Sequence, residues 1–316
     1  MFCADNKIGT GLCMNTKACV VDGTSYVNIL EDQFAWFTIV LLDSIEDVYD
    51  EYVNGGCDLI AGDQFSISPR FLENRDVDVA YTTGTKLFSK EPLSLVTREN
   101  ETAFSDVVNW IINSLVWSEE RNIAQADAGQ LDLTGVIGQL IPDAIENAVA
   151  AVGNFAEIYG RHLDAIRPRQ RVNLLNDGTT GRIYSQPVGN LATVGPGAPE
   201  KVIDIRRRER LNCGIRGRPY FADFDEAENS WVGIDVEFCN AIAGSLFSGQ
   251  FSGAVEYIDL ADGDAFESLA DGTIDLLSGG FAVSPELDFM EPSTGLGFTF
   301  SSPIYYDGLA FGGKSP

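Results

Sequence analysis

The strongest constraint on the fold is a strand–helix alternation that runs twice along the 316-residue chain and is interrupted once. Phe37–Leu42 and Cys57–Ala61 have the apolar composition of buried strands, and Ser44–Asn54 between them has helical spacing. The pattern returns as a strand over Leu211–Ile215 and a helix over Asp235–Phe247. Alternating strands and helices form mostly parallel sheets flanked by helices, so the sequence predicts an α/β fold with two lobes.

The same reading predicts further elements and a boundary between the lobes. A short strand, a glycine turn and a helix start are expected over 18–29, helices near 103–119, 142–163 and 265–271, and strands over 254–258 and 274–278. Residues 176–200 break the periodicity and end in a Gly/Pro-rich run. We therefore expect a domain over 1–185, a linker over 186–200 and a domain over 201–316.

Charge and apolar runs exclude several partners. With 21 Lys and Arg against 47 Asp and Glu, the formal charge of −26 repels phosphate backbones and anionic headgroups, so neither nucleic acid nor direct membrane insertion is expected. No apolar run approaches the ~20 residues of a membrane span, and Met1 is not followed by a targeting signal. The acidic pair Asp262 and Asp264 lacks the ligand spacing of a calcium loop, so no metal and no cofactor are predicted.

Six cysteines indicate an oxidising compartment. They contain no Cys-x-x-Cys pair of the kind that binds zinc, and an even set favours disulfides. Six cysteines allow many pairings; we expect Cys3–Cys13, which bracket a loop, together with Cys19–Cys57 and Cys213–Cys239, which lie one pair in each half. The sequon at Asn100 is a glycosylation candidate compatible with secretion. The protein is therefore predicted to be extracellular, secreted or periplasmic.

Several segments together resemble one family. Leu211–Ile215, Trp231–Ala243, Gly272–Ser278 and Ile304–Gly308 are similar to the first lobe of general L-amino-acid-binding proteins of ABC importers, whose fold is the two-lobed periplasmic-binding-protein type II fold. Cys19–Thr24, Gly56–Gln64 and Ser89–Leu93 resemble that family's second lobe, and the resemblance covers most of the chain. The cysteines at 19, 57, 213 and 239 also resemble those of the family, which supports the pairing within each lobe.

The order of these segments differs from the family's order. The second-lobe segments come first here and the first-lobe segments follow, which implies either a circular permutation or a repeat cut from a tandem array. A cysteine-bonded chain without a signal peptide favours the repeat, or a polymer whose neighbouring copies exchange lobes. Neighbouring copies of the chain, joined head to tail, are therefore predicted partners.

The resemblance also implies a ligand site that is only partly retained. Asp63 matches the family's aspartate for the ligand's α-ammonium group, and Gly23 and Thr24 match a turn that offers backbone donors. Leu287 stands at the position of the arginine that holds the α-carboxylate, which implies weakened binding. Arg216, together with Arg218, is the candidate replacement.

Two non-enzymatic functions follow from these features. The chain shows no nucleophile elbow, zinc-protease motif or phosphate-binding loop, and His162 is its only histidine, expected at the surface. The lost arginine and the altered order favour a structural subunit of a head-to-tail assembly with weakened amino-acid binding. The alternative is a functional extracellular receptor that binds an amino acid or a related small molecule.

Overall fold

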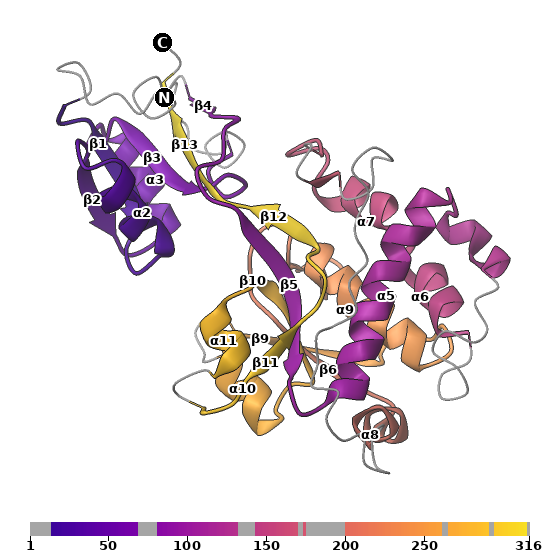
Figure 1. The fold of residues 1–316 in the computed structure, drawn as a ribbon. Helices are drawn as coiled ribbons and strands as arrows, with labels where there is room; N and C mark the ends of the chain where they lie inside the picture. The colour runs from indigo at the N-terminus through magenta and orange to yellow at the C-terminus, as the bar shows by residue number, and fades with distance from the viewer. Residues whose placement is uncertain are drawn as a thin grey trace. The chain divides into compact units, whose positions relative to one another are not determined.

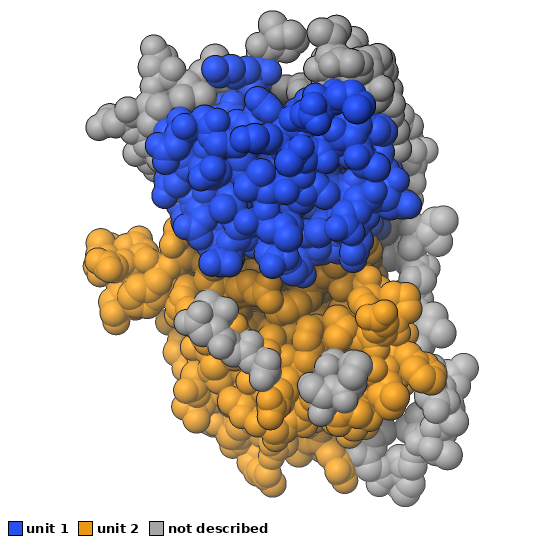
Figure 2. Space-filling model, turned by 90° about the vertical axis from the view of Figure 1, so that its left-hand side faces the viewer, with its two compact units in different colours: residues 1–91, 306–316 blue, residues 92–305 orange. Residues whose placement is uncertain are grey.

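The computed structural model describes residues 14–68, 81–131, 143–169, 173–174, 200–260, 265–290 and 294–314. It divides the chain into unit 1, residues 1–91 and 306–316, and unit 2, residues 92–305, which are coloured separately in Figure 2. The predicted Cys3–Cys13 disulfide, the acidic pair at 262 and 264, and residues 186–199 of the predicted linker lie outside the described residues. The two units are described one at a time.

Unit 1 is built on a five-stranded sheet in the order β2-β1-β3-β13-β4 (Figure 1). Its elements are β1 (Lys17–Val21), α2 (Ser25–Gln33), β2 (Thr38–Leu42), α3 (Ile45–Val53), β3 (Leu59–Asp63), β4 (Thr82–Thr83) and β13 (Leu309–Gly313). Strand β1 runs parallel to β2 and β3, whereas β13 runs antiparallel to β3 and β4. The predicted parallel core of this lobe is therefore present, with one antiparallel strand added.

The core of unit 1 lies on both faces of this sheet. Ala18 and Val20 of β1 pack in a cluster with Leu30 of α2 and with Phe34, which follows that helix, whereas Cys19 packs in a second cluster with residues of α3. Successive side chains of a strand point to opposite faces, so covering both faces produces the continuous apolar run seen in the sequence.

Unit 2 contains a second sheet in the order β11-β5-β10-β6-β9, with β12 paired to β5. The strands of this sheet are β5 (Glu91–Arg98), β6 (Leu211–Ile215), β9 (Val255–Asp259), β10 (Leu276–Ala282), β11 (Phe298–Phe300) and β12 (Tyr305–Asp307), of which Glu91, Tyr306 and Asp307 are counted with unit 1. β7 (Asp223–Asp225) and β8 (Ser230–Val232) form a separate two-stranded sheet in unit 2. Its helices are α5 (Thr102–Glu120), η1 (Gln125–Gln130), α6 (Ala144–Val152), α7 (Phe155–His162), α8 (Glu200–Arg208), α9 (Ile234–Leu246), α10 (Ala265–Asp271) and α11 (Pro285–Phe289). β6 runs parallel to β9 and β10, and β5 runs antiparallel to β10 and β11. None of the helices in the described ranges is long and apolar enough to cross a membrane.

The helix predicted over 142–163 is two helices in the structure. Gly153 adopts a φ of 84°, which ends α6, and Asn154 then caps α7 by accepting a hydrogen bond from the backbone of Glu157 at 3.0 Å. The Glu157 side chain in turn accepts from the Asn154 backbone, which completes a capping box. Helical spacing continues across this break in the sequence, so periodicity alone did not reveal it.

The compact units do not coincide with the predicted domains. Residues 92–169 belong to unit 2, because β5 pairs with β10 and β11, and α5 and α6 pack against α9. The chain leaves unit 1 after Glu91 and returns at Tyr306, and β13 then pairs with β3. The predicted α/β class is confirmed, while the permuted lobe order stays a prediction.

Each unit has one disulfide in its described residues, and both were predicted. Cys19 of β1 is joined to Cys57, which precedes β3, and Cys213 of β6 is joined to Cys239 of α9. The Cα atoms lie 5.8 and 6.3 Å apart, within the range that disulfides bridge. Each bond therefore joins two elements of one unit.

Removing the Cys213–Cys239 disulfide is expected to destabilise unit 2. The double substitution Cys213→Ala and Cys239→Ala should lower the free energy of unfolding by about 2–4 kcal/mol, because the unfolded chain gains the freedom that the cross-link removes. Urea unfolding of the oxidised variant and the oxidised parent measures the difference. Equal urea midpoints and slopes would contradict this expectation.

Candidate functional site

Three residues predicted from the family resemblance meet at one edge of the unit 1 sheet. Gly23 and Thr24 follow β1, and Asp63 is the last residue of β3. Because β1 and β3 are parallel, their carboxyl ends lie at the same edge, where ligands of open α/β sheets bind. The structure thus brings together the unit 1 residues that the sequence selected.

Asp63 belongs to a group of acidic side chains around one tyrosine, which we call the Tyr26 cluster: Tyr26, Asp63, Glu91 and Ser25. The hydroxyl of Tyr26, in the first turn of α2, forms a hydrogen bond to Asp63 Oδ1. The same hydroxyl lies 2.9 Å from Glu91 Oε2, and Ser25 donates to Glu91 Oε1 at 3.2 Å. Two carboxyl groups therefore converge on one buried hydroxyl.

The proton balance of the Tyr26 cluster favours a positively charged donor. A tyrosine hydroxyl has one proton and can donate it to only one of the two carboxylates. Burial raises the pKa of Glu91, an effect reinforced by the nearby charge of Asp63 and opposed by the hydrogen bond from Tyr26. Burial and the same two carboxylates also raise the pKa of Tyr26. An ammonium group, with three donors and a positive charge, would satisfy both carboxylates at once.

The hydrogen-bond donors of the turn at Gly23 and Thr24 are partly engaged by adjacent residues of the chain. Gly23 adopts a φ of 73°, and its N–H donates to Asp22 Oδ1 at 2.8 Å. The hydroxyl of Thr24 donates to the carbonyl of Val21 at 2.8 Å, so it is engaged in holding the turn. These two contacts indicate a structural task for the turn beside the predicted binding task.

In unit 2, the arginines proposed from the sequence lie just beyond β6. Arg216 directly follows that strand, and its guanidinium carbon lies 4.6 Å from the centroid of the Phe281 ring. The guanidinium carbon of Arg218 lies 3.5 Å from the centroid of the Phe221 ring. Leu287 is half-buried in α11 and has an apolar side chain, so it offers an anion no hydrogen bond.

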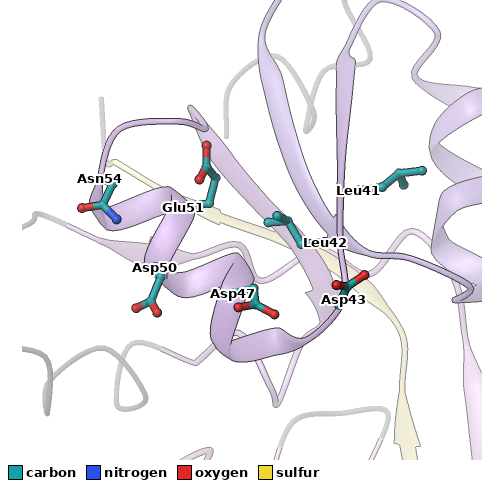
Figure 3. Close-up of a pocket in the computed structure, with 7 residues that line it drawn as sticks. All are labelled: Leu41, Leu42, Asp43, Asp47, Asp50, Glu51 and Asn54. Carbon is teal, nitrogen blue, oxygen red and sulfur yellow. The ribbon is translucent and has the colours of Figure 1, made fainter.

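A separate cavity of about 360 Å³ lies on unit 1 at α3. Its lining carboxylates project from α3 and from the turn that precedes it (Figure 3), and the lining residues are Leu41, Leu42, Asp43, Asp47, Asp50, Glu51 and Asn54. No group of three or more His, Cys, Asp or Glu residues in the described ranges is arranged to hold a metal ion.

Two further residues from the sequence reading lie away from these clusters. Asn100 is exposed in the turn between β5 and α5, as a glycosylation acceptor requires. His162, expected at the surface, is only 18% exposed, and its Nε2 lies 3.1 Å from Glu237 Oε1, which also pairs with Arg161. The histidine is thus part of an α7–α9 contact within unit 2.

Comparison with known proteins gives relatives of one kind. The chain is 26% identical over 193 residues to the general L-amino acid-binding periplasmic protein AapJ of Rhizobium johnstonii, and 26% identical over 192 residues to the glutamate/glutamine/aspartate/asparagine-binding protein BztA of Rhodobacter capsulatus. The chain is similar to periplasmic amino-acid-binding proteins. Each match covers 54% of this chain and 56% of the relative, so it spans about half the length of these relatives.

Comparison of structures gives a weaker likeness. A periplasmic binding protein of an ABC transporter from Brucella ovis, solved with glutathione bound, aligns with a TM-score of 0.43 and 21% identity. The alignment covers 57% of this chain and 64% of that chain. No protein-family model matches the chain.

The sequence reading missed three members of the Tyr26 cluster, namely Tyr26, Glu91 and Ser25. Glu91 lies in the segment Ser89–Leu93, which supported the family resemblance but was not assigned a role in binding. Tyr26 lies two residues after Thr24, in the first turn of the helix that follows the predicted turn. Tyr26 is hydrogen-bonded to both Asp63 and Glu91, and single-sequence patterns do not reveal that the fold brings these distant residues together.

Proposed function

We propose that this protein is a non-enzymatic receptor of the periplasm or extracellular space that binds an amino acid or a related amine-bearing solute. Its relatives AapJ and BztA are named for amino-acid binding, and their similarity to this chain supports the proposal. The oxidising compartment agrees with the two disulfides of the described residues. Amino-acid binding, predicted as the alternative, is thus favoured over a purely structural subunit.

The observation that carries the proposal is the Tyr26 cluster. Asp63 and Glu91 stand on either side of the Tyr26 hydroxyl at the carboxyl edge of a parallel sheet. Two half-buried carboxyl groups that share the Tyr26 hydroxyl repel each other when both are charged, and a ligand ammonium group would offset that repulsion. The resemblance gives Asp63 this same role, and the geometry adds Glu91 as its partner.

The head-to-tail assembly stays a prediction without a supporting observation. The relatives are named as binding proteins, and the retained Asp63 supports binding more directly than the altered lobe order supports a filament. Light scattering of the purified protein tests both ideas, because a receptor is expected as single chains and an assembly as large particles.

Substitution of Asp63 by Asn is expected to weaken binding of an amino acid by at least roughly 30-fold, about 2 kcal/mol, because the ligand ammonium group would lose its charged acceptor. Titration calorimetry with the common L-amino acids first identifies the ligand on the parent protein. The same titration is then repeated on the Asp63→Asn and Glu91→Gln variants.

Glu31→Gln is the matched control, because Glu31 is an exposed carboxylate of α2 outside the Tyr26 cluster. It removes one negative charge from the same unit and should leave affinity within about twofold of the parent. If Asp63→Asn binds the ligand as tightly as Glu31→Gln, the role of the Tyr26 cluster is wrong; if none of the amino acids binds to the parent, amino-acid binding is refuted.

A further inference from the structure

Strand β2 is an open, apolar edge of the unit 1 sheet. It is the outermost strand in the order β2-β1-β3-β13-β4, and among the described residues it pairs with β1 alone (Figure 1). Its five residues, Thr38–Leu42, include no charged side chain and no proline, and Leu41 is 47% exposed. An edge of this kind offers unpaired backbone groups to another strand.

The other outer strands of the two large sheets are protected from such pairing. β4 has two residues, β11 has three, and β9 carries the charged side chains of Glu256 and Asp259. Short strands and charged side chains are devices that keep a sheet edge from pairing with another chain. In the part of the chain that the structure describes, β2 is the outer strand that lacks both devices, which indicates an edge that accepts a partner.

The β2 backbone has two residues whose N–H and C=O groups face outward. The N–H of Thr38 and the carbonyl of Leu42 form hydrogen bonds of 2.9 and 2.8 Å to the residues that flank β1, so both face β1. Alternate residues of a strand direct their backbone groups to opposite sides, so those of Ile39 and Leu41 point away from β1. A peptide strand laid beside β2 would bond to Ile39 and Leu41.

The acidic cavity at α3 adjoins the carboxyl end of this edge. Leu41 and Leu42 of β2 line one part of the cavity, and carboxylates line the rest (Figure 3). The carboxylates belong to Asp43, Asp47, Asp50 and Glu51, and no Lys or Arg is among the lining residues. A strand that pairs with β2 passes this cavity, so a lysine or arginine of that strand can place its cation among the carboxylates.

The charge of the cavity selects the kind of partner. Each copy of the chain has a formal charge of −26, so two copies paired through their β2 edges would bring two acidic surfaces together. Like charges that face each other across an interface weaken it, whereas a basic partner is attracted and associates faster. The edge and the cavity together therefore fit an extended, basic peptide better than a second copy.

We propose that β2 and the adjoining cavity bind a basic peptide segment of another protein, which adds as a strand to the unit 1 sheet. The peptide backbone pairs with Ile39 and Leu41, and a lysine or arginine side chain enters the cavity beside Asp43 and Glu51. In this mode of recognition, backbone bonds supply affinity and side-chain contacts supply specificity. The site shares no residue with the Tyr26 cluster, so it does not depend on the proposed function.

The test uses a short, fluorescein-labelled peptide of alternating valine and lysine residues, and fluorescence anisotropy follows its binding to the intact protein. The parent protein is expected to bind this peptide. A peptide with glutamate in place of lysine should bind at least about tenfold more weakly, because the cavity repels its charges. A lysine peptide with N-methylated backbone amides should also lose at least about tenfold, because it cannot donate hydrogen bonds to the edge.

Two variants of the protein test the edge and the cavity separately. Leu41→Pro removes an outward N–H and should weaken peptide binding at least about tenfold, since proline is tolerated where the N–H of an edge strand faces solvent. Its control, Leu41→Val, keeps the N–H and should stay within about threefold of the parent. Asp43→Asn with Glu51→Gln should weaken binding at least about tenfold, whereas Glu31→Gln with Asp32→Asn, two exposed carboxylates of α2, should stay within about threefold.

Several results would overturn the proposal. If the parent does not bind the lysine peptide, or binds its N-methylated form equally well, strand pairing at β2 is refuted. Equal affinities of the cavity variant and the α2 control would refute the role of the cavity. If light scattering shows that the parent self-associates and Leu41→Pro does not, β2 pairs with a second copy and the proposal is wrong. Thermal melts confirm that each variant is folded, and the N-methylated peptide tests the edge even if Leu41→Pro does not fold.

Discussion

Replacing Asp275 by alanine is expected to lower the free energy of unfolding by about 3–5 kcal/mol, the usual cost of removing one partner from a buried ion pair. Asp275 is fully buried, its Oδ2 accepts a hydrogen bond from Arg208, and its Oδ1 forms an ion pair with Lys201 Nζ at 2.5 Å; both cations lie in α8. It also accepts from the backbone N–H of Asn212 in β6 at 2.8 Å. The substitution would leave two cations facing a buried space. Urea unfolding of the variant and the parent at pH 7 measures the loss.

The control for this prediction is Asp204→Asn. Asp204 also pairs with Arg208 and with Arg207, but its side chain is 43% exposed, so water screens the interaction. Its removal should cost about 1 kcal/mol or less. A loss at Asp275 no larger than the loss at Asp204 would mean that α8 is held by its apolar contacts alone.

Asp235→Asn is expected to remove a large pH dependence of stability. Burial raises the pKa of Asp235 from 3.8 to about 7, against the opposing effects of Arg218, Ser278 and Arg216. Between these pH values the Asp235 carboxyl is protonated in the native chain and ionised in the unfolded chain, so the contribution of Asp235 to stability is largest below pH 3.8 and falls as the pH rises to about 7. A shift of about three pKa units corresponds to about 4 kcal/mol.

The measurement is a series of urea unfolding curves from pH 4 to pH 8. The difference in stability between Asp235→Asn and the parent should change by about 4 kcal/mol in favour of the variant as the pH rises, because Asn mimics the protonated acid. Asp223→Asn is the control, since Asp223 is exposed in β7. Parallel curves for Asp235→Asn and the parent would show that Asp235 titrates as an ordinary aspartate.

Apolar periodicity was enough to place most of the regular elements. The strand expected at Leu211–Ile215 and the helix expected at 265–271 have the predicted bounds as β6 and α10. These elements are buried on one face or both, so the spacing of their apolar residues predicts whether they are helices or strands. The two disulfides could also be predicted, because each joins cysteines within one half of the sequence.

The antiparallel strands could not be placed in the same way. β5 and β13 each join a sheet formed largely by the other half of the chain, and a short apolar strand does not indicate which distant strand it will pair with. The predicted domain boundary therefore followed the Gly/Pro-rich linker instead of the two points where the chain passes between units. Asp63 was predicted from the family resemblance. The sequence did not predict Glu91, because its place beside Tyr26 and Asp63 depends on the tertiary structure.

The placement of β13 has a consequence for the order in which the protein can fold during synthesis. β13 lies between β3 and β4, so the sheet of unit 1 stays incomplete until residues 309–313 have left the ribosome. All of unit 2, residues 92–305, is translated after β4 and before β13, and domains generally fold as units. Cys19 and Cys57 both precede this interval, so the bond that joins β1 to the residues before β3 involves no residue of β13 and can form in the oxidising compartment before β13 has paired.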